Sequence, residues 1–203
     1  MNPAPQFDRT YAALRRLVMT GAWHPGERID VAIASDRLDA SASPIREALR
    51  HLVGEGLLVA GTSEGVAMPI VTEPDLIDLY RWHHELMQIA ARVSGSGNIA
   101  ALPSRASEDS ADTATALFSA IAARSGNGEH VIAIERLGAR LHLTRLVEAE
   151  LLGDVDSELA TLRTFVEEPQ SAGLRTALAR YHRRRFRMAG RIVQQIHRRP
   201  RRS

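Results

Sequence analysis

The feature that most limits how this chain can fold is a helical repeat of apolar residues that runs from Thr72 almost to the C-terminus. Apolar residues recur there at intervals of three and four, which places them on one face of a helix. Because no alternating strand pattern interrupts the repeat, we expect an antiparallel bundle of helices. The expected helices, separated by short segments rich in Gly, Ser, Asn or Pro, cover residues 72–93, 107–124, 129–152, 157–167 and 171–197.

The first 70 residues have a different organisation. Apolar spacing predicts a helix from Tyr11 to about Gly21 and a second over 31–38. A third helix would have Ser43 as its N-cap and Pro44 at its first position, where the missing N–H costs nothing. Residues 57–60 and 66–70 are typical of the two strands of a β-hairpin. This order predicts a winged helix-turn-helix, so the fold class is mainly α, with domains at 1–70 and 71–203.

Composition excludes several classes of protein. The 203 residues include no cysteine, which removes disulfides, thiolate nucleophiles and cysteine-ligated metal sites. No segment reaches 18 uncharged apolar residues, and the start lacks the basic and apolar regions of a signal peptide. With 44% hydrophobic residues the chain can build real cores. We therefore expect a soluble cytoplasmic protein that does not enter a membrane.

The net charge of +2 is unevenly distributed along the chain. Residues 1–70 carry −1, residues 71–179 carry −7, and residues 180–203 carry +10, all of it from arginine. The arginines at 180–191 fall mostly opposite the apolar face of the last helix. A basic face that packs against the acidic segment of the same domain is the interpretation we favour. A second electrostatic contact with nucleic acid is the alternative.

Four short motifs in the first 70 residues are specific in combination. They are Tyr11–Arg15, Gly21–Ile29, Ser41–Leu52 and Glu55–Leu57. Together they resemble the N-terminal domain of GntR-family bacterial transcription regulators. The resemblance implies a DNA-binding regulator, expected to be a repressor, that binds a pseudo-palindromic operator in double-stranded DNA as a homodimer.

The third predicted helix also has the chemistry that such a regulator needs. A helix whose N-terminus enters the major groove must present short polar side chains and an arginine there. Ser41, Ser43 and Arg46 meet that need, and Arg46 can reach a guanine with its two-pronged guanidinium. Arg50, one turn further on, is expected to meet a phosphate. Gly65 at the hairpin tip would let the backbone approach the DNA closely.

This domain departs from the family pattern at two positions. Asp39 stands in the turn where the family usually has glycine, and Ala42 stands where it usually has arginine. Asp tolerates the left-handed backbone conformation, so the turn is not threatened. The lost arginine predicts weaker or more salt-sensitive DNA binding, with the positive face confined to the third helix, the wing and Arg15 or Arg16.

The helical remainder contains Asp75–Tyr80, Ala90–Arg92 and Phe118 followed by Ser125–Asn127. It resembles, more weakly, the FCD ligand-binding domain of the FadR-like branch. That resemblance implies a small-molecule effector, such as an organic acid, and in many members a divalent metal. When the chain is aligned with the metal-ligand positions of FCD domains, His182 is the one ligand that remains. The other ligand positions hold Thr115, Ser119 and Arg163. One imidazole does not hold a metal, so we expect neither a metal nor another cofactor.

The histidines of the bundle allow more than one interpretation. His83 and His182 are the first candidates to line an effector pocket, with Ser119 and Arg163 as further candidates. A lone histidine more often satisfies a hydrogen bond. A metal-dependent hydrolase would use the same residues, but the chain has no nucleophile elbow, Gly-rich phosphate loop or carboxylate cluster. We therefore expect no enzyme. An effector-binding protein without specific DNA binding is the remaining alternative.

Overall fold

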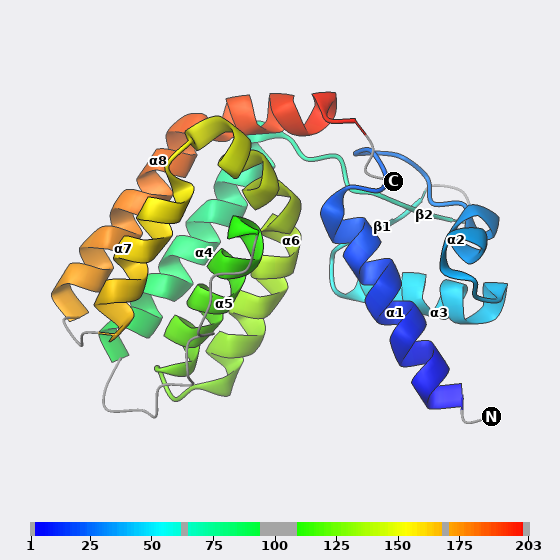
Figure 1. Ribbon diagram of the computed structural model, residues 1–203, viewed down its shortest axis with the longest axis horizontal. Helices are drawn as coiled ribbons and strands as arrows, with labels where there is room; N and C mark the ends of the chain where they lie inside the picture. Colours follow the sequence, from blue (N-terminus) through cyan, green and yellow to red (C-terminus); the bar gives the residue numbers. More distant parts are fainter. Residues whose placement is uncertain (1–2, 62–64, 94–108, 168–170, 201–203) are drawn as a thin grey trace. The chain divides into compact units, whose positions relative to one another are not determined.

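The computed structural model describes residues 3–61, 65–93, 109–167 and 171–200. The chain forms two compact units (Figure 1). The first comprises residues 1–71 together with 197–203, and the second comprises residues 72–196. None of the helices in the described residues combines the length and the apolar character that a membrane span requires.

Three helices and a small antiparallel hairpin make up the N-terminal unit: α1 (Pro3–Thr20), α2 (Val31–Leu38), α3 (Ala42–Gly54), β1 (Val59–Ala60) and β2 (Val66–Ala67). Both α1 and α2 pack against α3. In the hairpin Val59 pairs with Ala67 and Ala60 pairs with Val66. The core that holds these elements together is formed by Leu14, Val18, Trp23, Ile29, Ile45, Leu49, Leu52 and Leu58. The predicted winged helix-turn-helix order is confirmed.

The first helix begins at Pro3, two turns before the predicted start at Tyr11. Pro3 and Pro5 fall in its first turn, where proline is tolerated because those N–H groups have no helical partner. The extra turns gain packing from Phe7, whose ring lies 6.0 Å from that of Tyr11 and 5.2 Å from that of His51.

The turn between α2 and α3 is tight. Asp30 caps α2 by accepting a hydrogen bond from the Ala32 N–H at 2.7 Å. Asp39 ends α2 with φ 46° and ψ 47°, which confirms the expected left-handed conformation. The predicted cap of α3 was wrong, because Ser41, and not Ser43, has the extended backbone of the N-cap. Pro44 is compatible with any position in the first turn, so it did not identify the first residue of the helix.

The hairpin is shorter than predicted. Leu57 and Leu58 form the turn after α3, where both N–H groups donate to the Leu52 carbonyl and Gly56 has φ 72°. Both leucines are buried, so their apolar character serves the core and not a strand. The segment between the two predicted strands includes residues 62–64, which lie outside the described residues.

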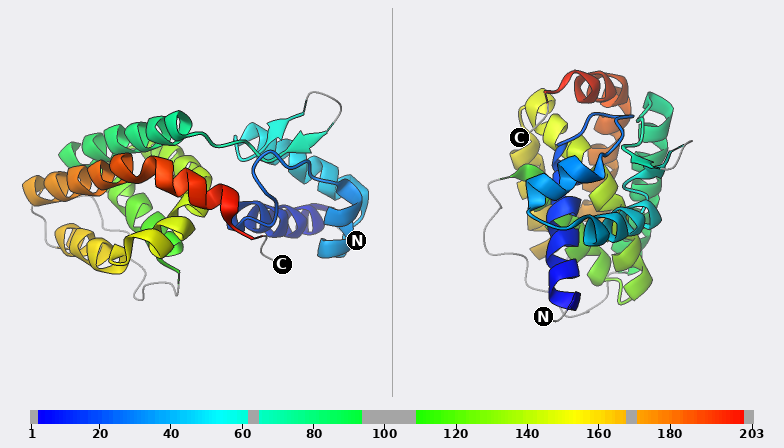
Figure 2. Two further views of the ribbon diagram at one scale, coloured as in Figure 1. Left: turned by 90° about the horizontal axis from the view of Figure 1, so that it is seen from above. Right: turned by 90° about the vertical axis from the view of Figure 1, so that its right-hand side faces the viewer.

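The second unit is a helical bundle of α4 (Glu73–Val93), α5 (Ser110–Ala123), α6 (Gly128–Leu152), α7 (Val155–Glu167) and α8 (Ser171–Arg198). Figure 2 shows these helices from two further sides. The predicted helices are confirmed to within a few residues where the structure describes them. The predicted break that follows residue 93 lies outside the described residues. Thr72 caps α4, since its hydroxyl accepts from the Asp75 N–H and the Asp75 carboxylate accepts from the Thr72 N–H. One apolar core joins α4, α5, α6, α7 and α8.

Candidate nucleic-acid interface and buried polar cluster

The exposed face of α3 carries two arginines one turn apart. Arg46 and Arg50 are exposed, while Ile45, Ala48 and Leu49 on the other side of the helix are buried. Arg46 and Arg50 line a depression of about 950 Å³ between α3 and the hairpin. Cationic side chains around a concave surface next to an exposed helix are suited to hold a phosphate backbone.

Arg28 contributes a third arginine to this depression, and our sequence analysis did not identify it as a site residue. A Cβ atom on Gly65 would lie 2.8 Å from the Arg28 Nε, so the glycine leaves room for this side chain. Ile29 is buried, and alternation along a short extended segment then points Arg28 outward. That alternation was the signal that could have found Arg28. A side chain at position 65 would therefore collide with Arg28 within the protein itself, whether or not Gly65 also approaches DNA closely.

Ser41 and Ser43 are both exposed at the start of α3. The Ser41 side chain forms no capping hydrogen bond, so the N–H groups of the first turn have no side-chain acceptor at that cap. Uncapped N–H groups at a helix N-terminus can donate to a phosphate.

Arg15 is engaged within the unit, which corrects the expectation that it adds to a positive face. Its Nε lies 3.3 Å from the Glu55 carboxylate, to which the Tyr11 hydroxyl also donates. Burial and the neighbouring Glu55 raise the pKa of Tyr11 to about 12. Of the two arginines of α1 that were expected to form the positive face, Arg16 is the one that is exposed and can contact an anion.

Residues 6–67 match the family model described as "Bacterial regulatory proteins, gntR family". The N-terminal unit is a GntR-family helix-turn-helix domain. The predicted resemblance is therefore confirmed for this domain. A curated relative, the uncharacterised HTH-type transcriptional regulator YdhC of Bacillus subtilis (strain 168), is 33% identical over 91 residues. That match spans 45% of this chain and 41% of the relative, so it covers less than half of either protein.

Solved structures extend the likeness in fold beyond the GntR domain. E. coli McbR/YncC has a TM-score of 0.68 and 19% identity, with 91% of this chain and 97% of that chain covered. A protein described as a GntR transcriptional regulator from Rhodococcus sp. RHA1 has a TM-score of 0.74 and 15% identity, with 94% and 98% covered. At these identities the likeness shows the fold, a helix-turn-helix domain followed by a helical region.

In the helical unit that follows the GntR domain, the two histidines predicted to line a pocket contact each other. His83 on α4 and His182 on α8 are completely buried, with His83 Nδ1 2.8 Å from His182 Nε2. Arg145 on α6 lies 3.3 Å from His83 Nε2 and donates to the Thr115 hydroxyl at 2.8 Å. The Leu178 carbonyl lies 2.7 Å from His182 Nδ1.

These contacts fix the tautomer of each ring. The Leu178 carbonyl can only accept, so His182 carries its proton on Nδ1 and its Nε2 accepts. His83 must then donate from Nδ1 and accept from Arg145 at Nε2. Burial, with the second imidazole and Arg145 beside it, lowers the pKa of His83 well below its ordinary value. Burial also lowers the pKa of His182 to about 3, so both rings are neutral.

The other two predicted pocket residues do not join this pair. Ser119 is half-buried on α5, and Arg163 on α7 pairs with Glu167 of its own helix at 3.8 Å. The residue that sequence analysis missed is Arg145, which is 3% exposed. An arginine flanked by Leu141 and Leu146 on the buried side of α6 was the signal that could have found it.

The His83–His182 pair does not fit a divalent metal. All four of its ring nitrogens take part in hydrogen bonds, and the Arg145 guanidinium, 3.3 Å from His83 Nε2, repels cations. Within the part of the chain that the structure describes, no three His, Asp or Glu residues are grouped to bind a metal ion.

A second buried cluster lies around Glu148 on α6. Its carboxylate accepts from the Tyr80 hydroxyl at 2.6 Å and from Arg185 Nε at 2.7 Å. Arg185 also donates to Glu158 on α7 at 2.8 Å, and Arg184 pairs with Asp154 and Glu158. Two arginines of the basic segment 180–203 are therefore bound by acids of the same unit, as the favoured interpretation of that segment predicted.

Proposed function

We propose that the protein is a transcription regulator that binds double-stranded operator DNA through α3 and the hairpin. The observation that carries the proposal is the depression lined by Arg28, Arg46 and Arg50 in a GntR-family domain. Arg46 would read a guanine in the major groove, and Arg28 and Arg50 would hold phosphates. Ser41 and Ser43 would contact the backbone at the N-terminus of α3, and Gly65 lies beside Arg28.

The test is a titration with a duplex that the wild-type protein has selected from a random library, at several salt concentrations. Arg46→Ala should weaken binding to that duplex by roughly 10- to 100-fold, since a bidentate base contact contributes about 1 to 3 kcal/mol. Arg50→Ala should weaken binding to selected and scrambled duplexes alike, and reduce the slope of log affinity against log salt by about one.

The matched control is Arg140→Ala, which removes an exposed arginine of α6 in the helical unit. Its affinity should equal that of the wild type. The proposal is wrong if the library yields no duplex preferred over a scrambled one, or if Arg46→Ala keeps the wild-type preference.

We also propose a homodimer formed through the helical unit. Trp82 and Ile89 on α4 are 54% and 40% exposed, and they are seven residues apart, which places them on one stripe of the helix. Ile132 on α6, a helix that packs against α4, is 44% exposed. Large apolar side chains exposed on one stripe of a helix are typical of an interface. A dimer would carry two DNA-binding domains, which would match a pseudo-palindromic operator.

Trp82→Glu/Ile89→Glu should convert a dimer into a monomer, because two carboxylates on the stripe cannot be buried without a partner. Size-exclusion chromatography with light scattering measures the molar mass of each variant in solution. The control is Ile33→Glu, which places the same charge on an exposed apolar position of α2, 52% exposed, and should leave the mass unchanged. A wild-type monomer at micromolar concentration, or a double variant that remains dimeric, contradicts the proposal.

Regulation would come from a small organic acid that binds the helical unit. The acid would bind more tightly to the dimer when its two DNA-binding domains have one particular spacing. We propose that the protein represses transcription. We also propose that it binds no metal and no other cofactor. We assign the helical unit to the FCD type of the FadR-like branch. The Asp75–Tyr80 motif that opens α4 and the all-helical composition of the unit support this assignment.

A further inference from the structure

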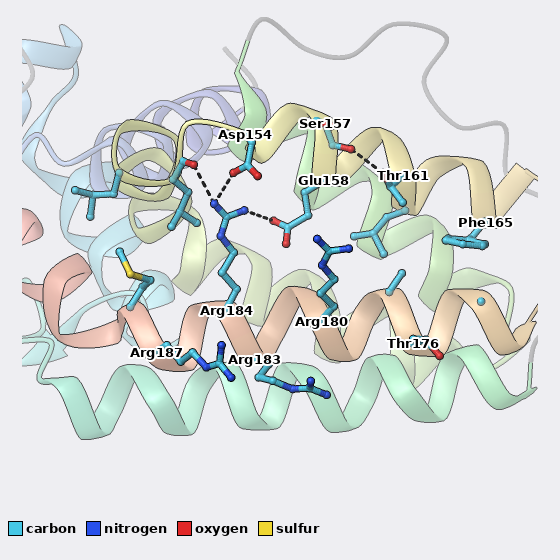
Figure 3. A pocket seen from close by; sticks show the side chains of 16 residues that line it. Asp154, Ser157, Glu158, Thr161, Phe165, Thr176, Arg180, Arg183, Arg184 and Arg187 are labelled. Carbon is cyan, nitrogen blue, oxygen red and sulfur yellow. Dashed lines mark hydrogen bonds and ion pairs between the residues drawn. The ribbon is translucent and has the colours of Figure 1, made fainter.

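A cavity of about 1140 Å³ lies between α7 and α8 in the helical unit (Figure 3). This volume suits a small organic molecule. At one end the ring of Phe165 lies against the backbone of Gly173, where a Cβ atom would come within 2.4 Å of the ring. The apolar part of the lining consists of Leu151, Leu152, Leu162, Phe165, Ala177 and Met188.

Four arginines of α8 line the same cavity. They are Arg180, Arg183, Arg184 and Arg187, and their intervals of three, four and seven residues place them within an arc of about 100° on the helix. The first and last are two turns apart, about 10 Å along the helix axis. Like charges at these intervals repel each other, so this arrangement costs stability unless anions are present.

One of the four is already neutralised. Arg184 reaches toward α7 and pairs with Asp154 and Glu158 (Figure 3), and it holds the pKa of Asp154 below its ordinary value. Arg180, Arg183 and Arg187 are exposed, and no described residue forms a hydrogen bond or an ion pair with them. The cavity therefore joins an apolar lining to three guanidinium groups without an acidic partner in the described chain.

We propose that this cavity binds an organic anion with an apolar body. A guanidinium group presents paired N–H donors that match a carboxylate or a phosphate. Arg180, which extends from α8 toward α7 in Figure 3, would hold such a head group, and Arg187 would add positive charge to the cavity lining. The apolar body would lie against Leu162, Phe165 and Met188. The role of this cavity as the effector site rests on the proposed function as a transcription regulator. The proposed effector site is then this cavity and not the surroundings of His83 and His182, whose buried rings are hydrogen-bonded to each other.

Calorimetric titration of the full chain, without DNA, tests this site with 4-phenylbutyrate and with phenyl phosphate as probes. We expect at least one of them to bind with one molecule per chain. The neutral amide 4-phenylbutyramide should bind at least tenfold more weakly than 4-phenylbutyrate if the carboxylate is held by arginine. Butyrate, which lacks the ring, should also bind at least tenfold more weakly.

Arg180→Gln/Arg187→Gln should weaken probe binding at least tenfold and leave the helical circular dichroism unchanged, because both side chains are exposed. Arg191→Gln is the matched control, since Arg191 is an exposed arginine of α8 that does not line the cavity, and it should bind the probe as the wild type does.

The inference is overturned if neither probe binds, if the amide binds as well as the carboxylate, or if Arg191→Gln weakens binding as much as the double variant. A lower mass of the double variant in light scattering would also overturn it, because a second copy of the chain would then cover this face. The titration contains no DNA, so a failure of operator binding leaves its result intact. A failure of probe binding likewise leaves the operator titration intact.

Discussion

Glu148→Ala is expected to lower the free energy of unfolding of the helical unit by about 3 to 5 kcal/mol, the usual cost of removing one partner of a buried ion pair. Glu148 is 1% exposed and accepts hydrogen bonds from Tyr80 and Arg185. Its loss leaves the Tyr80 hydroxyl without an acceptor and leaves the Arg185 charge, 0% exposed, with Glu158 as its remaining carboxylate partner. It also opens a cavity in α6.

Urea unfolding followed by circular dichroism measures this loss. Glu135→Ala is the control, because Glu135 is an exposed acid of the same helix and its removal should cost less than about 0.5 kcal/mol. Glu148→Met/Arg185→Met should recover most of the loss, since apolar side chains of similar volume replace a buried pair at little cost. A loss of less than 1 kcal/mol for Glu148→Ala would show that the carboxylate is hydrated in solution.

The fold could be predicted largely because its signals are local. Apolar spacing of three and four marks each helix of the second unit, and Thr72 with Asp75 forms a cap that is contained within four residues. The errors arose where two structures share one local pattern. Pro44 suits any position of a first turn, and the apolar pair Leu57–Leu58 suits a buried turn as well as a strand.

The candidate sites could be predicted only in part, because their contacts join distant residues. Arg46 and Arg50 follow from one helix face, which the sequence shows directly. His83 and His182 are 99 residues apart, and their contact depends on how α4 packs against α8. Periodicity places each ring on a buried face but does not say that the rings bond to each other. For the same reason it does not show that Arg145 reaches them from α6.

Acidification from pH 7.5 to pH 5 is expected to destabilise the helical unit by at least about 2 kcal/mol. In the unfolded chain a histidine has a pKa near 6.5, whereas burial lowers the pKa of His182 to about 3 in the folded chain. Between these values the unfolded chain binds a proton that the folded chain does not, so the free energy of unfolding falls as the pH falls. At pH 5 His182 alone accounts for about 2 kcal/mol, since one pKa unit corresponds to about 1.4 kcal/mol.

Among the other groups of the helical unit with a shifted pKa, the histidines act in the same direction, and Asp154 titrates outside this pH range. His83 adds to the loss, because its pKa is also lowered by burial, by His182 and by Arg145. His84 adds a smaller part, since its pKa is lowered by partial burial. Asp154 has its pKa lowered from 3.8 by Arg184, so it stays ionised throughout the range from pH 7.5 to 5.

Urea titrations at several values of pH measure the slope. His182→Gln removes one titrating group and should reduce the slope, although it also lowers stability at pH 7.5 because the bond to the Leu178 carbonyl is lost. His51→Gln, at an exposed position of α3 in the other unit, should leave the slope of the helical unit unchanged. An unfolding free energy that is constant between pH 7.5 and 5 would mean that water reaches the two rings. The neutral chain of hydrogen bonds from Arg145 to Leu178 would then be wrong.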